Sequence, residues 1–181
     1  MLTVSFLACK VIPVDKNNAE GIAKIQKFVQ KNCADHNKLV EGENYSPDYH
    51  ALVCEDATKN YKNKDGKTRG IQEKWVGVLL YKVEELFGEP EANELYINLV
   101  CTSTKRRRKG IATKLLKEAD EIAHHANMPQ LSLMTKDKGM AMVASIHGYT
   151  AEGKTTSELS DAEITKMNEW VKLMGKGYFL K

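Results

Sequence analysis

The sequence predicts a fold of the α/β (α+β) class, in which helices flank a mixed, mostly antiparallel central sheet. Three observations lead to this class. A strand-like segment is followed by apolar residues at helical spacing, three strand-like segments then follow one another, and a later helical segment precedes a buried strand. The 181 residues, 42% hydrophobic and 28% charged, suit a single globular domain over residues 1–181.

The first elements are a strand and a helix. Apolar residues alternate or run together over residues 2–12, which predicts a strand. Asp15 or Asn17 is expected to cap the helix that follows. Apolar residues at spacings of one, three and four predict that helix, namely Ala19, Ile22, Ile25, Phe28 and Val29.

Three antiparallel strands are expected next. Residues 49–54 and 75–83 indicate neighbouring strands of a long hairpin, and Asp65-Gly66 between them favours a turn because glycine tolerates positive φ. Residues 94–101 indicate the third strand. It is expected to begin after a loop that contains Pro90, because proline cannot donate a hydrogen bond within a central sheet.

A helix and a parallel strand are expected after the third of these strands. Apolar residues recur at spacings of three and four over residues 110–126, and this helix must end before Pro129. Residues 131–134 are typical of a buried strand, so the helix forms a right-handed crossover between parallel strands. Residues 140–146 indicate a short helix.

The last part of the chain carries a capping-box pattern. Ser160 and Glu163 have the spacing that begins a helix. The helical spacing of the apolar residues predicts that this helix continues to residue 174. Residues 178–181 indicate a final strand. The apolar residues of the predicted helix are Ile164, Met167, Val171 and Met174.

Charge and cysteine usage exclude several classes of protein. The net charge of +3 is too small for a protein that binds nucleic acid over its whole surface. The longest apolar run, residues 75–81, is far shorter than the roughly 18 residues of a membrane helix. The four cysteines form no CxxC pair, which argues against a zinc site and for reduced thiols in a cytoplasmic protein. The basic run at residues 105–109 leaves a nuclear location open.

The junction at residues 102–113 is the most informative segment. A predicted strand ends there, a basic loop follows, and a helix begins at Gly110. Unpaired amides at a helix start attract anions, and Gly110 and Ala112 leave room for a phosphate to reach the backbone. The segment has neither the Walker A spacing nor GxGxxG, so both of these nucleotide-binding interpretations fail.

This junction resembles the acyl-CoA-binding motif of the GNAT superfamily of N-acetyltransferases. The pattern Arg/Gln-x-x-Gly-x-Gly/Ala is matched by Arg107, Gly110 and Ala112. The order of elements up to about Tyr149 also resembles that family's fold, with the phosphate loop between its fourth strand and the next helix. Gly148-Tyr149, with Ala141 before them, resembles its closing signature. Residues 155–177 are expected to form an inserted helical segment, longer than the family's usual link between its last strands.

The resemblance implies acetyl-CoA as cosubstrate, with no metal, and transfer of its acetyl group to a primary amine. The pyrophosphate would lie on the amides of residues 108–113, the pantetheine arm would pair beside Val100 and Thr102, and the basic run would attract the 3′-phosphate. The implied cofactor-binding residues are Val100, Cys101, Thr102, Arg107, Arg108, Lys109, Gly110, Ile111, Ala112 and Thr113.

The resemblance also implies catalytic residues on the strand before the loop. Glu94, Tyr96 and Asn98 share one strand face, and Glu94 is the carboxylate that is able to take the proton of the amine; the alternative is a solvated carboxylate at a strand end. The tyrosine that often protonates the leaving thiolate is replaced by Ala144. Ser145 and His147 are nearby, and water or the departing ammonium can also supply this proton.

The acceptor site is implied to lie between two acidic segments, residues 33–50 and 84–94. Their carboxylates and tyrosines suit a cationic small amine or a polyamine. Ordinary solvated loops, a protein lysine or N-terminal acceptor, a non-catalytic acyl-CoA-binding domain, a nucleic-acid module and a homodimer all remain open. The expected substrate-binding residues are Glu41, Tyr45, Glu84, Glu85 and Trp170, the last on a helix that caps the pocket.

Overall fold

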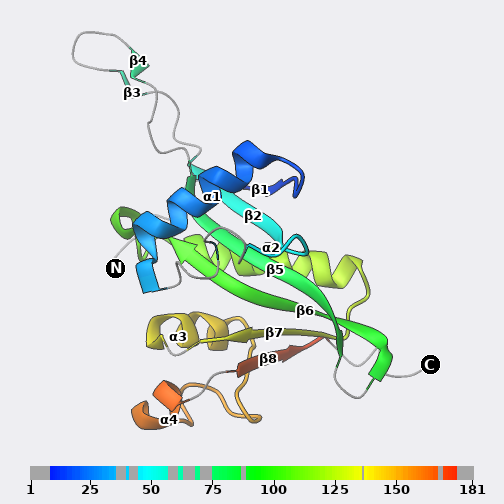
Figure 1. The fold of residues 1–181 in the computed structure, drawn as a ribbon. Coiled ribbons are helices and arrows are strands. Elements are labelled where there is room, and N and C mark those ends of the chain that lie inside the picture. Colours follow the sequence, from blue (N-terminus) through cyan, green and yellow to red (C-terminus); the bar gives the residue numbers. More distant parts are fainter. Residues whose placement is uncertain are drawn as a thin grey trace. The chain divides into compact units, whose positions relative to one another are not determined.

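A computed structural model describes residues 9–35, 40, 45–56, 61–62, 68–69, 75–86, 89–135, 137–166 and 169–174. Helices and strands follow one another along the chain as shown in Figure 1. Their bounds are β1 (Cys9–Val14), α1 (Ala19–Asn32), β2 (His50–Asp56), β3 (Tyr61–Lys62), β4 (Thr68–Arg69), β5 (Trp75–Leu86), β6 (Glu89–Thr102), the 3-10 helix η3 (Thr104–Arg106), α2 (Ile111–His125), β7 (Gln130–Met134), α3 (Lys138–Ile146), α4 (Asp161–Lys166) and β8 (Glu169–Leu173).

Six strands form a mixed sheet in the order β1-β2-β5-β6-β7-β8, and β3 and β4 form a separate pair. β1 is antiparallel to β2, β7 is parallel to β6, and β8 is antiparallel to β7. The expected mixed sheet with flanking helices is therefore confirmed, as is the parallel strand after α2. The chain divides into two compact units, Met1–Leu79 with Val100–Leu115, and Leu80–Leu99 with Leu116–Lys181.

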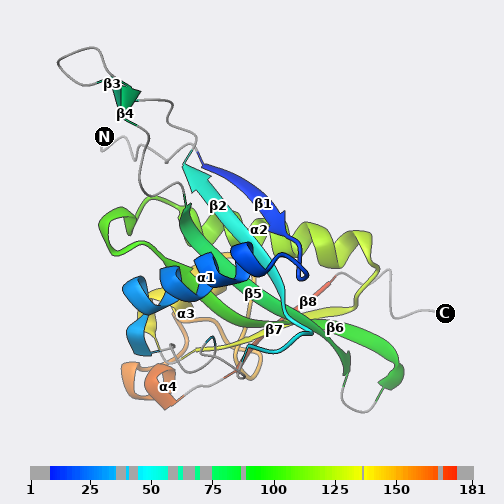
Figure 2. The ribbon, with the colours of Figure 1, turned by 45° about the horizontal axis from the view of Figure 1, so that its top comes forward.

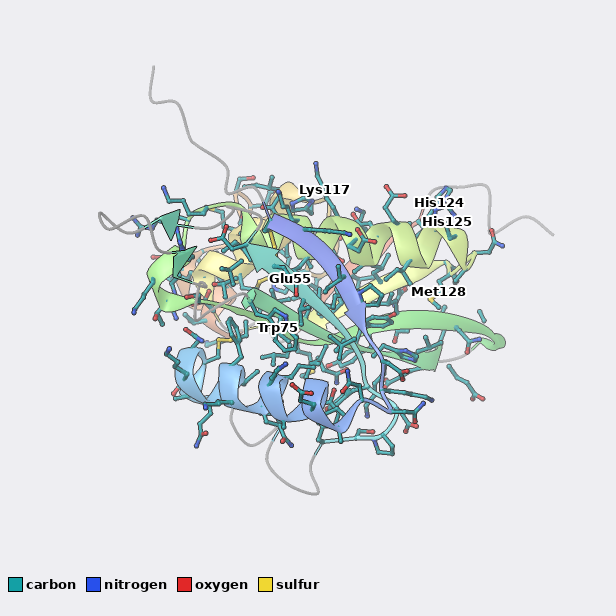
Figure 3. The ribbon with its side chains drawn as sticks, turned by 90° about the horizontal axis from the view of Figure 1, so that it is seen from above. Glu55, Trp75, Lys117, His124, His125 and Met128 are labelled. Carbon is teal, nitrogen blue, oxygen red and sulfur yellow. A yellow bond between two sulfur atoms is a disulfide. The ribbon has the colours of Figure 1, made fainter. Side chains whose placement is uncertain are left out.

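The first unit packs α1 against the strands that begin the sheet. Ile25 and Val29 of α1 are fully buried, as is Val53 of β2. Figure 2 shows β1 and β2 side by side with α1 lying along them. The indole of Trp75 on β5 donates a hydrogen bond to Glu55 Oε1 on β2, 3.1 Å away (Figure 3). The strands β2 and β5 are neighbours in the sheet, as expected. Residues 2–8 of the expected first strand lie outside the described residues.

The N-terminal cap of α1 is Asn18, not Asp15 or Asn17 as expected. Its side chain accepts a hydrogen bond from the amide of Gly21 at 3.0 Å. Asp15 instead accepts from the amide of Asn17 at 2.8 Å and closes the turn before the helix. All of these residue types favour caps, and the turn decides which one occupies the position.

Gly77 on β5 brings α2 close to the sheet within the first unit. A Cβ atom at this position would overlap Cγ2 of Ile111 and lie 3.0 Å from Cδ1 of Leu115. Both side chains are in the first turns of α2 and both are buried. The missing side chain of Gly77 therefore allows the start of α2 to approach the strand.

The expectation of reduced thiols is wrong in this structure, because all four cysteines form disulfides. Cys9 pairs with Cys54 and Cys33 with Cys101, with Cα–Cα distances of 5.7 and 6.1 Å. The partners are 45 and 68 residues apart in sequence, so no local spacing reveals them. Both Cα–Cα distances are ordinary for disulfides.

Strand β6 begins earlier than expected, at Glu89, and includes Pro90. Proline is tolerated in the first residues of a strand, where no ladder hydrogen bond depends on its nitrogen. In the second unit, β6 and β7 pair from Glu94 opposite Gln130 to Ile97 opposite Leu133. This register fixes which side chains of the two strands are neighbours.

The capping box at the start of α4 is confirmed. The amide of Ser160 donates to Glu163 Oε2 at 2.7 Å, and the amide of Glu163 donates to Ser160 Oγ at 3.3 Å. The expected continuation of this helix to residue 174 is wrong, because α4 ends at Lys166 and Trp170 lies on β8. Pairing of β8 with β7 overrides the helical spacing. Residues 178–181 lie outside the described part of the chain.

Gly148 and Tyr149 end α3 in the second unit. Gly148 has a φ of +86°, the left-handed conformation that glycine adopts without strain. The amide of Tyr149 then donates to the carbonyl of Ala144 at 3.1 Å, and the Tyr149 side chain is fully buried.

Among the described helices, none has the length and apolar character needed to span a membrane.

Candidate functional site

The phosphate loop, residues 103–110, lies in the first unit between β6 and α2. Ser103 is buried and its amide donates to the carbonyl of Val76 on β5 at 2.9 Å. The short helix η3 follows, and Arg108 and Gly110 then have φ angles of +60° and +74°. Glycine accepts such an angle freely, whereas an arginine does so at a cost of about 1 kcal/mol.

The end of this loop presents free backbone donors. The first hydrogen bond within α2 runs from the amide of Lys114 to the carbonyl of Gly110, at 3.0 Å. The amides of Ile111, Ala112 and Thr113 precede it and therefore have no acceptor within the helix. The helix dipole adds partial positive charge at the same place. These residues fit an anionic group such as a pyrophosphate.

The five cations of the loop fall into two groups. Arg106 forms an ion pair with the buried carboxylate of Asp56, with Nη2 and Oδ2 3.2 Å apart. Nη2 of Arg107 donates to the carbonyl of Asn32 at 3.4 Å. Lys105, Arg108 and Lys109 are exposed and have no such partner within the described part of the chain. The run of five cations therefore contains two arginines that bind other residues of the first unit and three cations that face solvent.

The loop also rests on residues that sequence reasoning does not single out. The side chain of Asn32, the last residue of α1, accepts a hydrogen bond from the amide of Thr104 at 3.1 Å. Asp56 is the last residue of β2 and holds Arg106. Their contacts join residues 50 to 75 positions apart, and no local pattern signals them.

The strand before the loop carries the residues expected to pair with pantetheine. Val100 and Thr102 are half-buried at the end of β6, and Cys101 between them is fully buried. The disulfide from Cys101 to Cys33 joins this strand end to the residue that follows α1. Cys101 therefore offers no free thiol to a ligand.

In the second unit, Glu94 is held by two donors on β7. Its Oε2 accepts hydrogen bonds from Gln130 Nε2 at 2.9 Å and from Ser132 Oγ at 2.8 Å. Ser132 is fully buried and Glu94 is half-buried. The carboxylate of Glu94 is thus held in one orientation by hydrogen bonds. This disfavours the alternative that Glu94 is a freely solvated carboxylate at a strand end. Sequence reasoning missed both donors.

Tyr96 and Asn98 lie on the same face of β6 as Glu94. All three are half-buried and alternate with the buried Leu95 and Ile97. The Oδ1 atom of Asn98 is buried and has no hydrogen-bond partner among the described residues. The expected grouping of these three side chains on one face thus agrees with their alternating burial.

The residues near the missing tyrosine have other bonds or environments. Ala144 is fully buried in α3, and Ser145 Oγ accepts a hydrogen bond from the amide of Thr156 at 3.2 Å. Burial lowers the pKa of His147, an effect that the nearby Asp120 carboxylate opposes. Burial raises the pKa of Tyr149. The described residues of α3 thus present no exposed tyrosine at the position where the family often has one.

The residues expected to bind the acceptor are described in part. In the first unit, Tyr45 and Tyr49 pack edge to face with ring centroids 5.5 Å apart, and burial raises the pKa of Tyr45. Glu41 lies outside the described residues. In the second unit, Glu84 and Glu85 are exposed on β5, and Trp170 is fully buried on β8. Trp170 is therefore a core residue of its unit.

Possible metal ligands do not gather into a site in the described part of the chain. No group of three or more histidine, cysteine, aspartate or glutamate side chains has a suitable arrangement there. His124 and His125 lie near each other at the end of α2, with ring centroids 5.9 Å apart, as Figure 3 shows. Neither unit therefore supplies an evident metal centre from these described residues.

Comparison with known proteins places the fold. Residues 36–149, more than half of the chain, match the sequence model of the "Acetyltransferase (GNAT) family". The GNAT family N-acetyltransferase YhbS from Escherichia coli, solved with CoA, is similar over 95% of this chain and 87% of its own, with 12% identity and a TM-score of 0.63. A search of curated proteins gives no match.

Two further solved structures share the fold. The NatC complex bound to Gag peptide and CoA matches 92% of this chain and 99% of the other, with 13% identity and a TM-score of 0.60. Aminoglycoside 6′-acetyltransferase type Ii matches 91% of this chain and 96% of its own, with 14% identity and a TM-score of 0.59. With its family match and this fold, the chain belongs to the GNAT family of acetyltransferases and is an acyltransferase.

Proposed function

We propose that this acyltransferase transfers the acetyl group of acetyl-CoA to the primary amine of a small cationic acceptor. The observation that carries the donor assignment is the phosphate loop. Gly110 gives it a left-handed turn, the first amides of α2 are free of intrahelical acceptors, and three of its cations face solvent. CoA carries a pyrophosphate and a 3′-phosphate, which suit these amides and cations respectively.

The proposed reaction uses Glu94 to prepare the acceptor. An ammonium has no lone pair, so Glu94 accepts its proton, directly or through water, before the nitrogen attacks the thioester carbonyl. A carbon–nitrogen bond then forms, the carbon–sulfur bond breaks, and the leaving thiolate takes up, directly or through water, the second proton that the nitrogen loses as it becomes an amide. The hydrogen bonds from Gln130 and Ser132 support this role because they fix the orientation of the carboxylate.

Replacing Glu94 with glutamine is expected to lower the turnover rate about 100-fold at pH values at which the acceptor amine is protonated. This factor is at the lower end of the range for general-base catalysis. Glutamine keeps an oxygen that accepts from Gln130 and Ser132. The loss should shrink as the pH rises and the amine deprotonates by itself. The pH dependence of kcat tests this expectation.

Glu118→Gln provides the matched control, because Glu118 is an exposed carboxylate on α2. It should leave the pH profile unchanged. A Glu94→Gln variant with the parent's rate and profile would assign the proton to another group or to water.

The proposal of a cationic acceptor rests on exposed carboxylates in both acidic segments. Asp35 and Asp48 are exposed in the first unit, and Glu84 and Glu85 are exposed in the second. Residues 84–94 contain five glutamates and no lysine or arginine. Carboxylates at this density attract cations over a distance of about 8 Å at physiological ionic strength.

A panel of amines with acetyl-CoA tests the acceptor class through release of the CoA thiol. A linear polyamine should react with the highest kcat/KM, ahead of a neutral monoamine and of a peptide with a free N-terminus. The KM for the polyamine should rise with salt and in the Glu84→Gln/Glu85→Gln variant, while the KM for acetyl-CoA stays nearly constant. Preference for the peptide or the neutral amine would refute the cationic acceptor and leave the donor assignment intact.

A further inference from the structure

We propose that Asn32 is a positioning residue for the phosphate loop and thereby sets the affinity for CoA. The inference rests on the proposed function, which assigns CoA to this loop. Asn32 is the last residue of α1 and is only 7% exposed. It touches neither the thioester nor the acceptor in this assignment, and it acts through residues 104 and 107.

Asn32 uses its side-chain donor, its side-chain acceptor and its backbone carbonyl. Nδ2 donates to the carbonyl of Phe28 at 2.9 Å, which orients the amide group on its own helix. Oδ1 then accepts from the amide of Thr104 at 3.1 Å, and the backbone carbonyl accepts from Arg107 Nη2 at 3.4 Å. One residue thus contacts both the start of η3 and the motif arginine that precedes the free amides.

The end of α1, from which Asn32 contacts the loop, is itself held in place. The next residue, Cys33, is bonded to Cys101 on the strand that leads into the loop. The amide of Ser103 is bonded to β5 through the carbonyl of Val76. The loop is therefore attached at its start, and Asn32 supplies a second attachment one residue further along, at Thr104, before the backbone reaches its two left-handed residues.

Removal of this attachment is expected to loosen the loop without changing the chemistry. A buried hydrogen bond contributes about 1 kcal/mol, so its loss should raise the dissociation constant for CoA roughly 5- to 10-fold. The KM for acetyl-CoA should rise by a similar factor. The kcat at saturation and the KM for the amine should not change, because the reacting groups keep their places.

Two substitutions remove the Thr104–Asn32 hydrogen bond from opposite ends. Asn32→Ala removes the acceptor, and Thr104→Pro removes the donor. Proline fits this position because Thr104 is the first residue of η3 and Ser103 before it has an extended ψ of 129°. Thr104→Ala is the matched control, since it deletes the exposed side chain and keeps the amide. CoA binding to each variant is measured by calorimetry, and folding by circular dichroism.

The expected result is weaker CoA binding in Asn32→Ala and Thr104→Pro, parent-like binding in Thr104→Ala, and no further loss from Thr104→Pro when Asn32 is already alanine. Parent-like binding in folded Asn32→Ala would overturn the inference, as would equal losses in Thr104→Ala and Thr104→Pro or a fall in kcat alone. Failure of the parent protein to bind CoA would instead refute the proposed function.

Discussion

Replacing Gly77 with alanine is expected to lower the free energy of unfolding by about 1–3 kcal/mol and to weaken CoA binding. The added Cβ would overlap Cγ2 of Ile111 and contact Leu115. Ile111 is β-branched and buried, so it has few alternative rotamers. The first turn of α2 must therefore move away from β5, and the free amides proposed to bind pyrophosphate move with it.

Denaturant unfolding and CoA calorimetry measure the two effects of Gly77→Ala. The double variant with Ile111→Ala should recover part of the loss, because the overlapping methyl group is then absent. Gly139→Ala is the control: Gly139 is exposed at the start of α3, and its added Cβ would approach only the side chain of Asp137, at 3.1 Å, so stability and CoA affinity should change little. A Gly77→Ala protein with the parent's stability and CoA affinity would contradict the prediction, because the added methyl group would then be accommodated without displacing the start of α2.

Removal of the Cys33–Cys101 disulfide by the double serine variant is expected to lower the free energy of unfolding by about 2–4 kcal/mol, since the bond closes a long loop in the unfolded chain. The partners are 68 residues apart. The affinity for CoA should fall as well, because this bond joins the end of α1 to the strand that enters the phosphate loop.

The Cys9→Ser/Cys54→Ser variant is the matched control for the second effect. This disulfide joins β1 to β2 and closes a separation of 45 residues, so its loss should destabilise the protein similarly and leave CoA affinity nearly unchanged. Thiol titration in denaturant should detect free thiols only after reduction. Four thiols in the unreduced, denatured protein would contradict both disulfides.

Local patterns predict the elements that lie within one stretch of chain. The helical spacing before Pro129 locates α2, and Arg107 with Gly110 locates the phosphate loop, because each signal lies within a few residues of the feature. The capping box of α4 is local in the same way. These predictions depend on backbone conformation and burial period, which neighbouring residues determine.

Local sequence patterns do not reveal the pairings between residues that are distant in the sequence. Val171 continues a helical spacing by coincidence, and pairing with β7 places it on a strand together with Trp170. The donors Gln130 and Ser132 become visible only once the register with β6 is known. Asn32 has no local signal either, because its partner Thr104 is 72 residues away. Tertiary contacts decide these positions and override local preference.

The end of α1 also has a thermodynamic consequence. Asn32 and Cys33 hold the proposed donor loop, and Cys33 also begins the acidic segment proposed to meet the acceptor. If binding of the acceptor moves Cys33, it also moves the support of the donor loop. The two substrates are then energetically coupled, and any factor by which one changes the affinity of the other holds equally in the reverse direction.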